Sequence, residues 1–364
     1  MIFRGMATGS QTTQEEGNLA GVNRAPVQQD RARRRVTIAQ IAKASGLSTA
    51  TVSKVLNGKP DVSAQTRTLV QEALLSSGYR KRGSGQAPPL IDVVFNDFDS
   101  PWALEIVRGA AAAAQPEGLT VAFTALSEGD ERQVWFDHIT SRGTRGVVLL
   151  LSQLTERQKG ELVARGLPFV VIDPTPEPGT EANSVGATNW SGGLAAAKHL
   201  VDLGHRRIGI ITGPPELLCS RARLDGYRAA LERSGLSVDD QMVRVGDFRV
   251  KAGYAQARVL FNVRDRPTGI FAGNDLSALG VLRAAREVGL RVPEDLSVVG
   301  FDDIPLAQWS TPSLTTVRQP LTEMAAMAVR ILLESAESTT PLKQCVELAT
   351  ELVVRESTAP PGGR

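Results

Sequence analysis

Hydrophobic positions between residues 36 and 82 recur at helical spacing. The pattern predicts three short helices, over residues 38–44, 49–56 and about 63–77. Thr37, Ser48 and Ser63 stand where they can cap these helices, since a side-chain oxygen there can accept a hydrogen bond from an exposed backbone amide. Gly46 ends the first helix because glycine tolerates positive φ. Asn-Gly and Lys-Pro pairs end the second helix before the third begins.

The second helix has two unlike faces. Val52, Val55 and Leu56 share one face and should pack on Ile41 and Leu47. The opposite face carries small or polar side chains: Thr49, Ala50, Ser53, Lys54 and Asn57. Such a helix fits the DNA major groove, where short side chains let the backbone approach and polar ones meet base edges. The alternative is a small three-helix bundle with a solvated polar face.

From Leu90 onward, short continuous apolar runs alternate with helical stretches. We expect strands at residues 91–96, 119–126, 146–151, 168–173, 207–213, 268–273, 296–302 and 346–354. We expect helices at residues 102–114, 131–141, 155–165, 192–203, 221–234, 251–261, 276–288 and 321–334. Strands that are apolar throughout indicate parallel sheets covered on both faces. So many strands over some 260 residues indicate two doubly wound lobes.

Charge is divided unequally along the chain. Residues 31–82 hold eleven Lys or Arg and two acids, a net +9, whereas the whole chain is only +2. The remainder is therefore about −7. A basic head on an acidic body is the electrostatic pattern of a phosphate binder. This pattern argues against the bundle with a merely solvated face.

Composition and short motifs exclude several classes of protein. The two cysteines, Cys219 and Cys345, lack metal-ligand spacing and do not make a disulfide framework, which fits a reducing cytoplasm. No apolar run reaches the length of a membrane span, and the N-terminus lacks a signal-peptide pattern. There is no P-loop and no nucleophile elbow. We therefore expect neither cofactor nor metal, no membrane partner, and a cytoplasmic location.

The run VTIAQIAKASGLSTATVSKVLNGKPDVSAQTRTLVQEALLSSGY, and TVSKVLNG above all, closely resembles the headpiece of the LacI/GalR family of bacterial transcription regulators. LTTVRQP at residues 314–320 is a second run similar to that family. The resemblance implies a small all-α helix-turn-helix headpiece followed by an α/β part. That part comprises two doubly wound parallel-sheet lobes of the periplasmic-binding-protein-like type.

The resemblance also implies domain boundaries. We expect a disordered tail at 1–35, the headpiece at 36–82, a flexible linker at 83–90, an effector-binding and dimerisation domain at 91–356 and a tail at 357–364. The lobes should comprise 91–189 plus 319–341, and 190–318 plus 342–356, so the chain crosses near Asn189, Arg318 and Pro341. Relatives usually have a hinge helix with an Ala and a Leu in the linker; Gly85 and Pro88 here favour a flexible basic linker.

The DNA-binding residues that the resemblance implies come from the headpiece. They are Thr37, Thr49, Ala50, Thr51, Ser53, Lys54, Asn57, Ser63, Thr66 and Tyr79. Base edges are assigned to Thr49, Ala50, Ser53 and Lys54, with Asn57 near them, because these lie on the polar face of the second helix. Positioning on the DNA backbone is assigned to Thr37, Ser63, Thr66 and Tyr79.

Polar and aromatic side chains gather where predicted strands end, which is where parallel α/β folds bind ligands. Aromatics, carboxylates, amides and arginines at one end of the sheets are the chemistry of a saccharide site. The family's effector-contact pattern falls on Trp102, Asp173, Arg223, Phe248, Asn274 and Asp302. Alternatives stay open: Asn274-Asp275 could cap a helix, Asp302-Asp303 could form a turn, and Trp102 or Phe248 could be core. Thr188 replaces an Asp that relatives carry beside Asn189.

The sequence thus predicts a DNA-binding repressor, not an enzyme, that binds a pseudo-palindromic operator as a homodimer. A small effector, a mono- or disaccharide, should bind between the lobes and couple to DNA affinity. Rival interpretations are a sugar-binding transport protein, a hydrolase using the cleft carboxylates, and a regulator controlled by a purine-like or protein signal.

Overall fold

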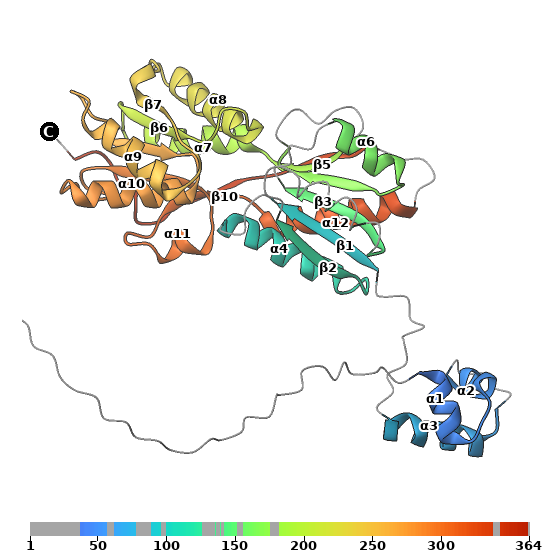
Figure 1. Ribbon diagram of the computed structural model, residues 1–364. Coiled ribbons are helices and arrows are strands. Elements are labelled where there is room, and N and C mark those ends of the chain that lie inside the picture. Colours follow the sequence, from blue (N-terminus) through green and yellow to red (C-terminus); the bar gives the residue numbers. More distant parts are fainter. Residues whose placement is uncertain are drawn as a thin grey trace, which may run out of the picture. The chain divides into compact units, whose positions relative to one another are not determined.

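The computed structural model describes residues 37–56, 62–77, 89–95, 100–125, 135, 139, 142–150, 156–174, 182–337 and 343–362. Contacts within the chain divide it into two units, Met1–Ser84 and Gly85–Arg364 (Figure 1). The Gly85 and Pro88 linker positions lie outside the described residues. So does the expected helix at 131–141, except for Trp135 and Ile139, which are helical.

The first unit contains three helices: α1 (Ile38–Ser45), α2 (Thr49–Leu56) and α3 (Ala64–Ser77). Ile41, Val52 and Val70 are fully buried and form the centre of its core, with Leu47 packed at the edge. Gly46 adopts a φ of 70° at the end of α1, where a side chain would be strained. The predicted helices and their packing on Ile41 are therefore confirmed.

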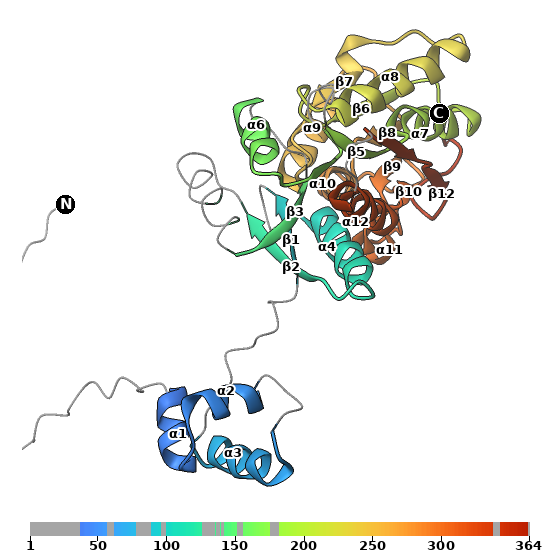
Figure 2. The same ribbon diagram turned by 90° about the vertical axis from the view of Figure 1, so that its right-hand side faces the viewer.

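The first lobe of the second unit is built on a six-stranded sheet in the order β11-β5-β4-β3-β1-β2, with every neighbouring pair parallel. Its strands are β1 (Leu90–Phe95), β2 (Thr120–Ala125), β3 (Thr144–Leu150), β4 (Phe169–Ile172), β5 (Asn183–Ala187) and β11 (Cys345–Leu348). Helices α4 (Pro101–Ala114) and α12 (Leu321–Glu337) lie side by side on one face (Figure 2). Helix α6 (Glu156–Ala164) lies on the other, where Leu162 and Trp135 are buried.

The second lobe has a six-stranded sheet in the order β12-β10-β9-β8-β6-β7. Its strands are β6 (Ile208–Thr212), β7 (Val243–Val245), β8 (Gly269–Ala272), β9 (Ser297–Asp302), β10 (Thr315–Arg318) and β12 (Glu351–Val353), of which only β12 runs antiparallel to its neighbour. Helices α7 (Asn189–Asp202) and α8 (Leu218–Arg233) cover one face (Figure 1). Helices α9 (Val250–Phe261) and α10 (Asp275–Glu287) cover the other, and a short α11 (Pro305–Trp309) follows β9. The predicted fold class, two parallel-sheet lobes after a helical headpiece, is confirmed.

The last predicted strand, at 346–354, is wrong as one element. The run forms two strands, and β11 pairs with β5 in the first sheet while β12 pairs with β10 in the second. The third crossing between lobes therefore falls at Ala349-Thr350 and not near Pro341. Thr350 breaks the strand because its amide donates to Thr188 Oγ1 at 3.0 Å instead of to a sheet neighbour.

The expected tail at 357–364 is also wrong for its first residues. Ser357 is fully buried; its Oγ donates to the Val298 carbonyl at 2.6 Å and accepts from the Thr315 amide at 2.8 Å. The Ala359 amide donates to Ser297 Oγ at 3.0 Å. Short hydroxyl side chains thus let an irregular segment satisfy backbone groups at the start of β9 and β10.

Candidate DNA-binding and effector sites

Helix α2 presents the face that the sequence predicted. Thr49, Ala50 and Lys54 are exposed, and Thr51 and Ser53 are half-buried. Val52 and Val55, on the other side, are buried in the headpiece core. Asn57 and Tyr79 lie outside the described residues. The short side chains and Lys54 therefore lie away from Val52 and Val55, the α2 residues that form part of the headpiece core.

Hydroxyl side chains fix the start of each headpiece helix. Thr37 forms a capping box with Gln40, and its Oγ1 accepts from the Gln40 amide at 3.3 Å. Ser48 Oγ accepts from the Thr51 amide at 3.1 Å, and Ser63 Oγ accepts from the Thr66 amide at 3.2 Å. The hydroxyls of Thr51 and Thr66 also hydrogen-bond these caps. Two of the predicted backbone-positioning residues, Thr37 and Ser63, are thus helix caps.

The six predicted effector residues converge on one small cavity between the lobes. The cavity has a volume of about 90 Å³ and is lined by Ser100, Trp102, Asp173, Cys219, Arg223, Phe248, Asn274, Leu276, Asp302 and Ile304. Ser100 and Trp102 stand at the start of α4, and Asp173 follows β4, all in the first lobe. The other residues come from the second lobe. The sequence did not single out Ser100, Cys219, Leu276 or Ile304, which carry no signal except their closeness to the motifs.

Arg223 is the cationic centre of this cavity and is only 4% exposed. Its Nε donates to Asn189 Oδ1 at 2.8 Å, and its Nη1 donates to the Gly273 carbonyl at 2.7 Å. The guanidinium lies 3.7 Å from the centroid of the Phe301 ring. Asp302 Oδ1 is 3.7 Å from Nη1, a looser ion-pair contact. The arginine is therefore held by neutral acceptors and a ring face as much as by charge.

Two buried carboxyl groups share the cavity with this one guanidinium. Burial raises the pKa of Asp302 to about 7, although Arg223 and the Gln319 amide favour the ionised form. Gln319 Nε2 donates to Asp302 Oδ1 at 2.6 Å. Burial raises the pKa of Asp173 to about 6, against the opposing effect of Arg223. Both groups thus change protonation near neutral pH, which is uncommon for a carboxyl and typical of functional sites.

Phe248 is held in a strained backbone conformation, with a φ of 65°. Asn274 Nδ2 donates to the Phe248 carbonyl at 3.0 Å and so stabilises that turn. The ring lies against Gly213, where an added Cβ would come within 2.1 Å of the nearest ring carbon. Only glycine leaves room for the aromatic side chain at this cavity wall.

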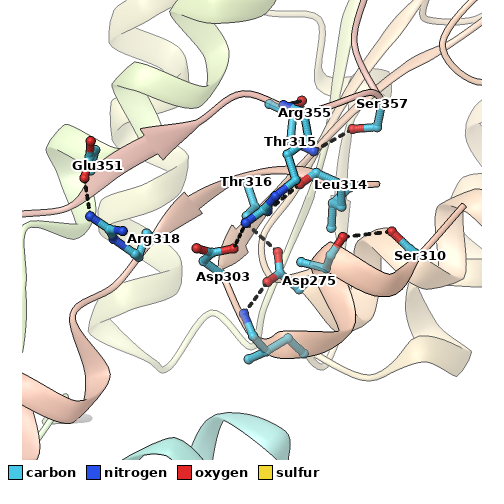
Figure 3. Close-up of polar contacts among 12 residues, drawn as sticks. Asp275, Asp303, Ser310, Leu314, Thr315, Thr316, Arg318, Glu351, Arg355 and Ser357 are labelled. Atoms are coloured by element: carbon cyan, nitrogen blue, oxygen red, sulfur yellow. Dashed lines mark hydrogen bonds and ion pairs between the residues drawn. The ribbon is translucent and has the colours of Figure 1, made fainter. Parts of the chain in front are cut away.

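The pair Asn274-Asp275 has two structural roles. Asn274 Oδ1 accepts from the Ser277 amide at 2.9 Å and caps α10. Asp275 is fully buried and accepts from the Ile304 amide at 2.9 Å and from Thr316 Oγ1, so it ties α10 to β10 and to the segment after β9 (Figure 3). Asn274 lines the cavity as well, whereas Asp275 does not.

A larger cavity, of about 460 Å³, shares Asp302 and Ile304 with the first one. Its two arginines are already paired: Arg318 contacts Glu351, and Arg355 Nη2 contacts Asp303 Oδ1 at 2.6 Å (Figure 3). This cavity is larger than the first, but the aromatic residues Trp102 and Phe248 and the buried guanidinium of Arg223 lie in the smaller one. We therefore take the smaller cavity as the candidate effector site.

Two kinds of site are missing from the described part of the chain. Within those ranges, no helix combines the length and apolar character that a membrane crossing requires. Among the same residues, no three side chains of the metal-ligating types come together.

A helical headpiece with a polar exposed helix, joined to two lobes around a polar cavity, defines the class of ligand-controlled DNA-binding regulators. The family model for bacterial regulatory proteins of the lacI family matches residues 37–81, and that for the periplasmic binding protein-like domain matches residues 197–358. This chain belongs to the lacI family of bacterial regulatory proteins. It is a DNA-binding transcription regulator and not an enzyme, and the two curated relatives described below are repressors.

This chain matches two curated relatives over almost the whole of their length. The transcriptional repressor PurR of Proteus mirabilis (strain HI4320) is 31% identical over 330 residues, which is 89% of this chain and 97% of PurR. The ribose operon repressor of Escherichia coli (strain K12) is 32% identical over 330 residues, which is 88% of this chain and 99% of that repressor.

Two solved structures have the same architecture. A complex of the transcriptional regulator CelR with cellobiose has a TM-score of 0.69 at 32% identity, over 89% of this chain and 100% of CelR. The lac repressor dimer bound to operator and an anti-inducer has a TM-score of 0.75 at 27% identity, over 90% of this chain and 100% of that chain.

Proposed function

We propose that this regulator is a dimeric repressor whose operator affinity is set by a saccharide bound in the small cavity between the lobes. The observation that carries the proposal is the convergence of Arg223, Asp173 and Asp302 with two aromatic residues from both lobes. Planar charged groups satisfy several hydroxyls at once, and aromatic faces cover the apolar face of a sugar ring. Because both lobes contribute, a ligand there would favour one lobe arrangement over others.

The size of the site is consistent with one or two sugar rings. Another cavity, of about 190 Å³, adjoins the candidate effector site and shares Asp173 and Cys219 with it. The candidate effector site alone is small. A monosaccharide would therefore extend toward the adjoining cavity of about 190 Å³, and a disaccharide would occupy both. Among the relatives named above, CelR is described in complex with cellobiose.

A thermal-shift screen of the purified full-length protein tests the effector class. D-ribose, cellobiose, other mono- and disaccharides, and purine bases should be compared at equal concentrations. A ligand that binds only the native form raises the melting temperature, by an amount equivalent to roughly 2.7 kcal/mol at a hundred times its Kd. A sugar that raises the melting temperature and changes operator binding in fluorescence anisotropy supports the proposal. A response to purines alone would reassign the site to a purine-like effector.

We propose that the DNA-reading face is that of α2, with Thr49, Ala50, Ser53 and Lys54 at base edges. Two headpieces of a dimer would then occupy successive major grooves of a pseudo-palindrome. Operator binding should weaken steeply with salt, since basic residues of the headpiece release counterions from phosphates. This function places the protein in the cytoplasm with the DNA.

We propose that the second lobe dimerises through α10 and α11. Trp309 on α11 is 74% exposed, an unusual state for so large an apolar side chain, and Leu306 beside it is 38% exposed. A groove lined by Leu282, Arg283 and Pro312 adjoins this helix. Trp309→Glu should shift the protein from dimer to monomer in analytical ultracentrifugation, whereas Trp190→Glu, at another exposed tryptophan, should not. Dimers that persist in Trp309→Glu would exclude this surface.

A further inference from the structure

Asn189 lies where the chain leaves the first lobe and begins α7, and its side chain is only 8% exposed. Its Nδ2 donates to the Ala187 carbonyl at 3.1 Å, which fixes the orientation of the amide. Its Oδ1 therefore faces Arg223 and accepts from Nε at 2.8 Å. A buried amide held at both ends is a rigid support for the group it contacts.

The contact with Asn189 determines how Arg223 presents its remaining donors. Nε is held by Asn189 and Nη1 by the Gly273 carbonyl, while the Phe301 ring lies against the guanidinium plane. These three constraints fix the plane of the group. Within the described residues, Nη2 makes no hydrogen bond, so its two hydrogens remain available to a ligand. Arg223 lines the effector cavity, whereas Asn189 lines only the adjoining one.

We infer that Asn189 is a positioning residue that sets the guanidinium of Arg223 in the orientation that binds the effector. The inference rests on the proposed effector function of this cavity. The same amide favours the ionised form of Asp173, which follows β4 in the first lobe, and so opposes the rise in the pKa of that carboxyl. One side chain thus holds a cationic group of the second lobe and acts on an acidic group of the first.

The neighbouring residue supports this division of roles. Thr188 stands at the N-cap of α7 but makes no capping hydrogen bond; its Oγ1 lies 3.1 Å from Thr350 Oγ1 on the third crossing. The Thr188 hydroxyl thus contacts the third crossing, whereas the Asn189 side chain contacts Arg223.

The arginine side-chain NMR spectrum of the full-length protein tests the inference without any effector. The Nε–Hε signal of Arg223, identified by its loss in Arg223→Lys, should exchange slowly with solvent because it is buried and hydrogen-bonded. In Asn189→Ala the signal should move and its exchange should accelerate. In Asn189→Asp, which keeps an acceptor oxygen, slow exchange should persist. An unchanged signal in Asn189→Ala, or loss of slow exchange in both variants, would overturn the inference.

A double-mutant cycle separates positioning from a general structural effect, with D-ribose and cellobiose as probes. Asn189→Ala should weaken binding roughly tenfold or more, because a charge-assisted hydrogen bond is lost. In an Arg223→Ala background the same substitution should have no further effect. Equal losses in both backgrounds would refute positioning through Arg223. If neither sugar binds the wild-type protein, the saccharide proposal loses its support, while the NMR result still decides the role of Asn189.

Discussion

Replacing Asp302 by asparagine should stabilise the protein without effector at pH 8. Burial raises the pKa of Asp302 from 3.8 to about 7, so the folded state retains a proton that the unfolded chain has released. The contribution of protonated Asp302 to the free energy of unfolding is therefore fully present below pH 3.8 and is lost as the pH rises through about 7. A tenfold change in proton affinity is worth about 1.4 kcal/mol, so a rise of the pKa from 3.8 to about 7 corresponds to a loss of roughly 4 kcal/mol at pH 8. Asparagine carries no charge and avoids this loss.

The geometry allows the substitution. The new amide would keep an oxygen that accepts from Gln319 Nε2, now 2.6 Å from Asp302 Oδ1. The contact with Arg223 is long, at 3.7 Å, and the arginine keeps its partners Asn189 and Gly273. Effector binding should be lost at the same time, because an ionised acceptor is removed from the cavity. The site would thus gain stability by losing function.

Thermal unfolding followed by calorimetry between about pH 4.5 and 8 measures the effect, since it spans the pKa of the buried group. Asp302→Asn should melt above the wild-type protein at pH 8, and the difference should shrink as the pH falls below 6. Asp303→Asn is the matched control, since Asp303 contacts Arg355 Nη2 at 2.6 Å and its loss should destabilise the protein at pH 8. An Asp302→Asn variant that melts below the wild type at every pH would refute the reasoning.

Three further predictions concern helix α2 of the headpiece, the cap of α10 and the buried side chain of Ser357. Lys54→Ala should lower specific operator affinity by about 1–3 kcal/mol in anisotropy titrations, since we propose that its exposed side chain contacts a base edge; an equal loss on random DNA would make it a phosphate contact. Asn274→Ala should lower the melting temperature through a lost helix cap of about 1 kcal/mol, which Asn274→Asp, with the same acceptor, should largely restore. Ser357→Ala should destabilise the second lobe by about 1–3 kcal/mol in denaturant unfolding, because the buried Thr315 amide loses its acceptor; a change confined to operator affinity would contradict this.

Local chemistry made the headpiece predictable. The caps Thr37, Ser48 and Ser63, the break at Gly46 and the apolar spacing of α2 act over a few residues, and the helices have the expected bounds within about one residue. The strands made of continuous apolar runs were predictable as well, because their pattern is also local. Short strands were missed: β5, β7 and β10 have three to five residues and include polar or small side chains. Only their sheet neighbours make them strands.

The sequence by itself determined the class of the protein, because the headpiece motif and the alternation of strands and helices depend on local spacing. It also supplied the six residues of the candidate effector site, four of which follow or end a strand. Only the tertiary structure decided which polar atoms at the site already have hydrogen-bond partners. Asn274 caps α10 and binds the Phe248 carbonyl, and the guanidinium of Arg223 donates to Asn189, thirty-four residues away. The neighbouring Asp275 is buried and accepts from the Ile304 amide. Hydrogen bonds between residues so far apart along the chain depend on how the sheets and helices pack, and no local pattern encodes that packing.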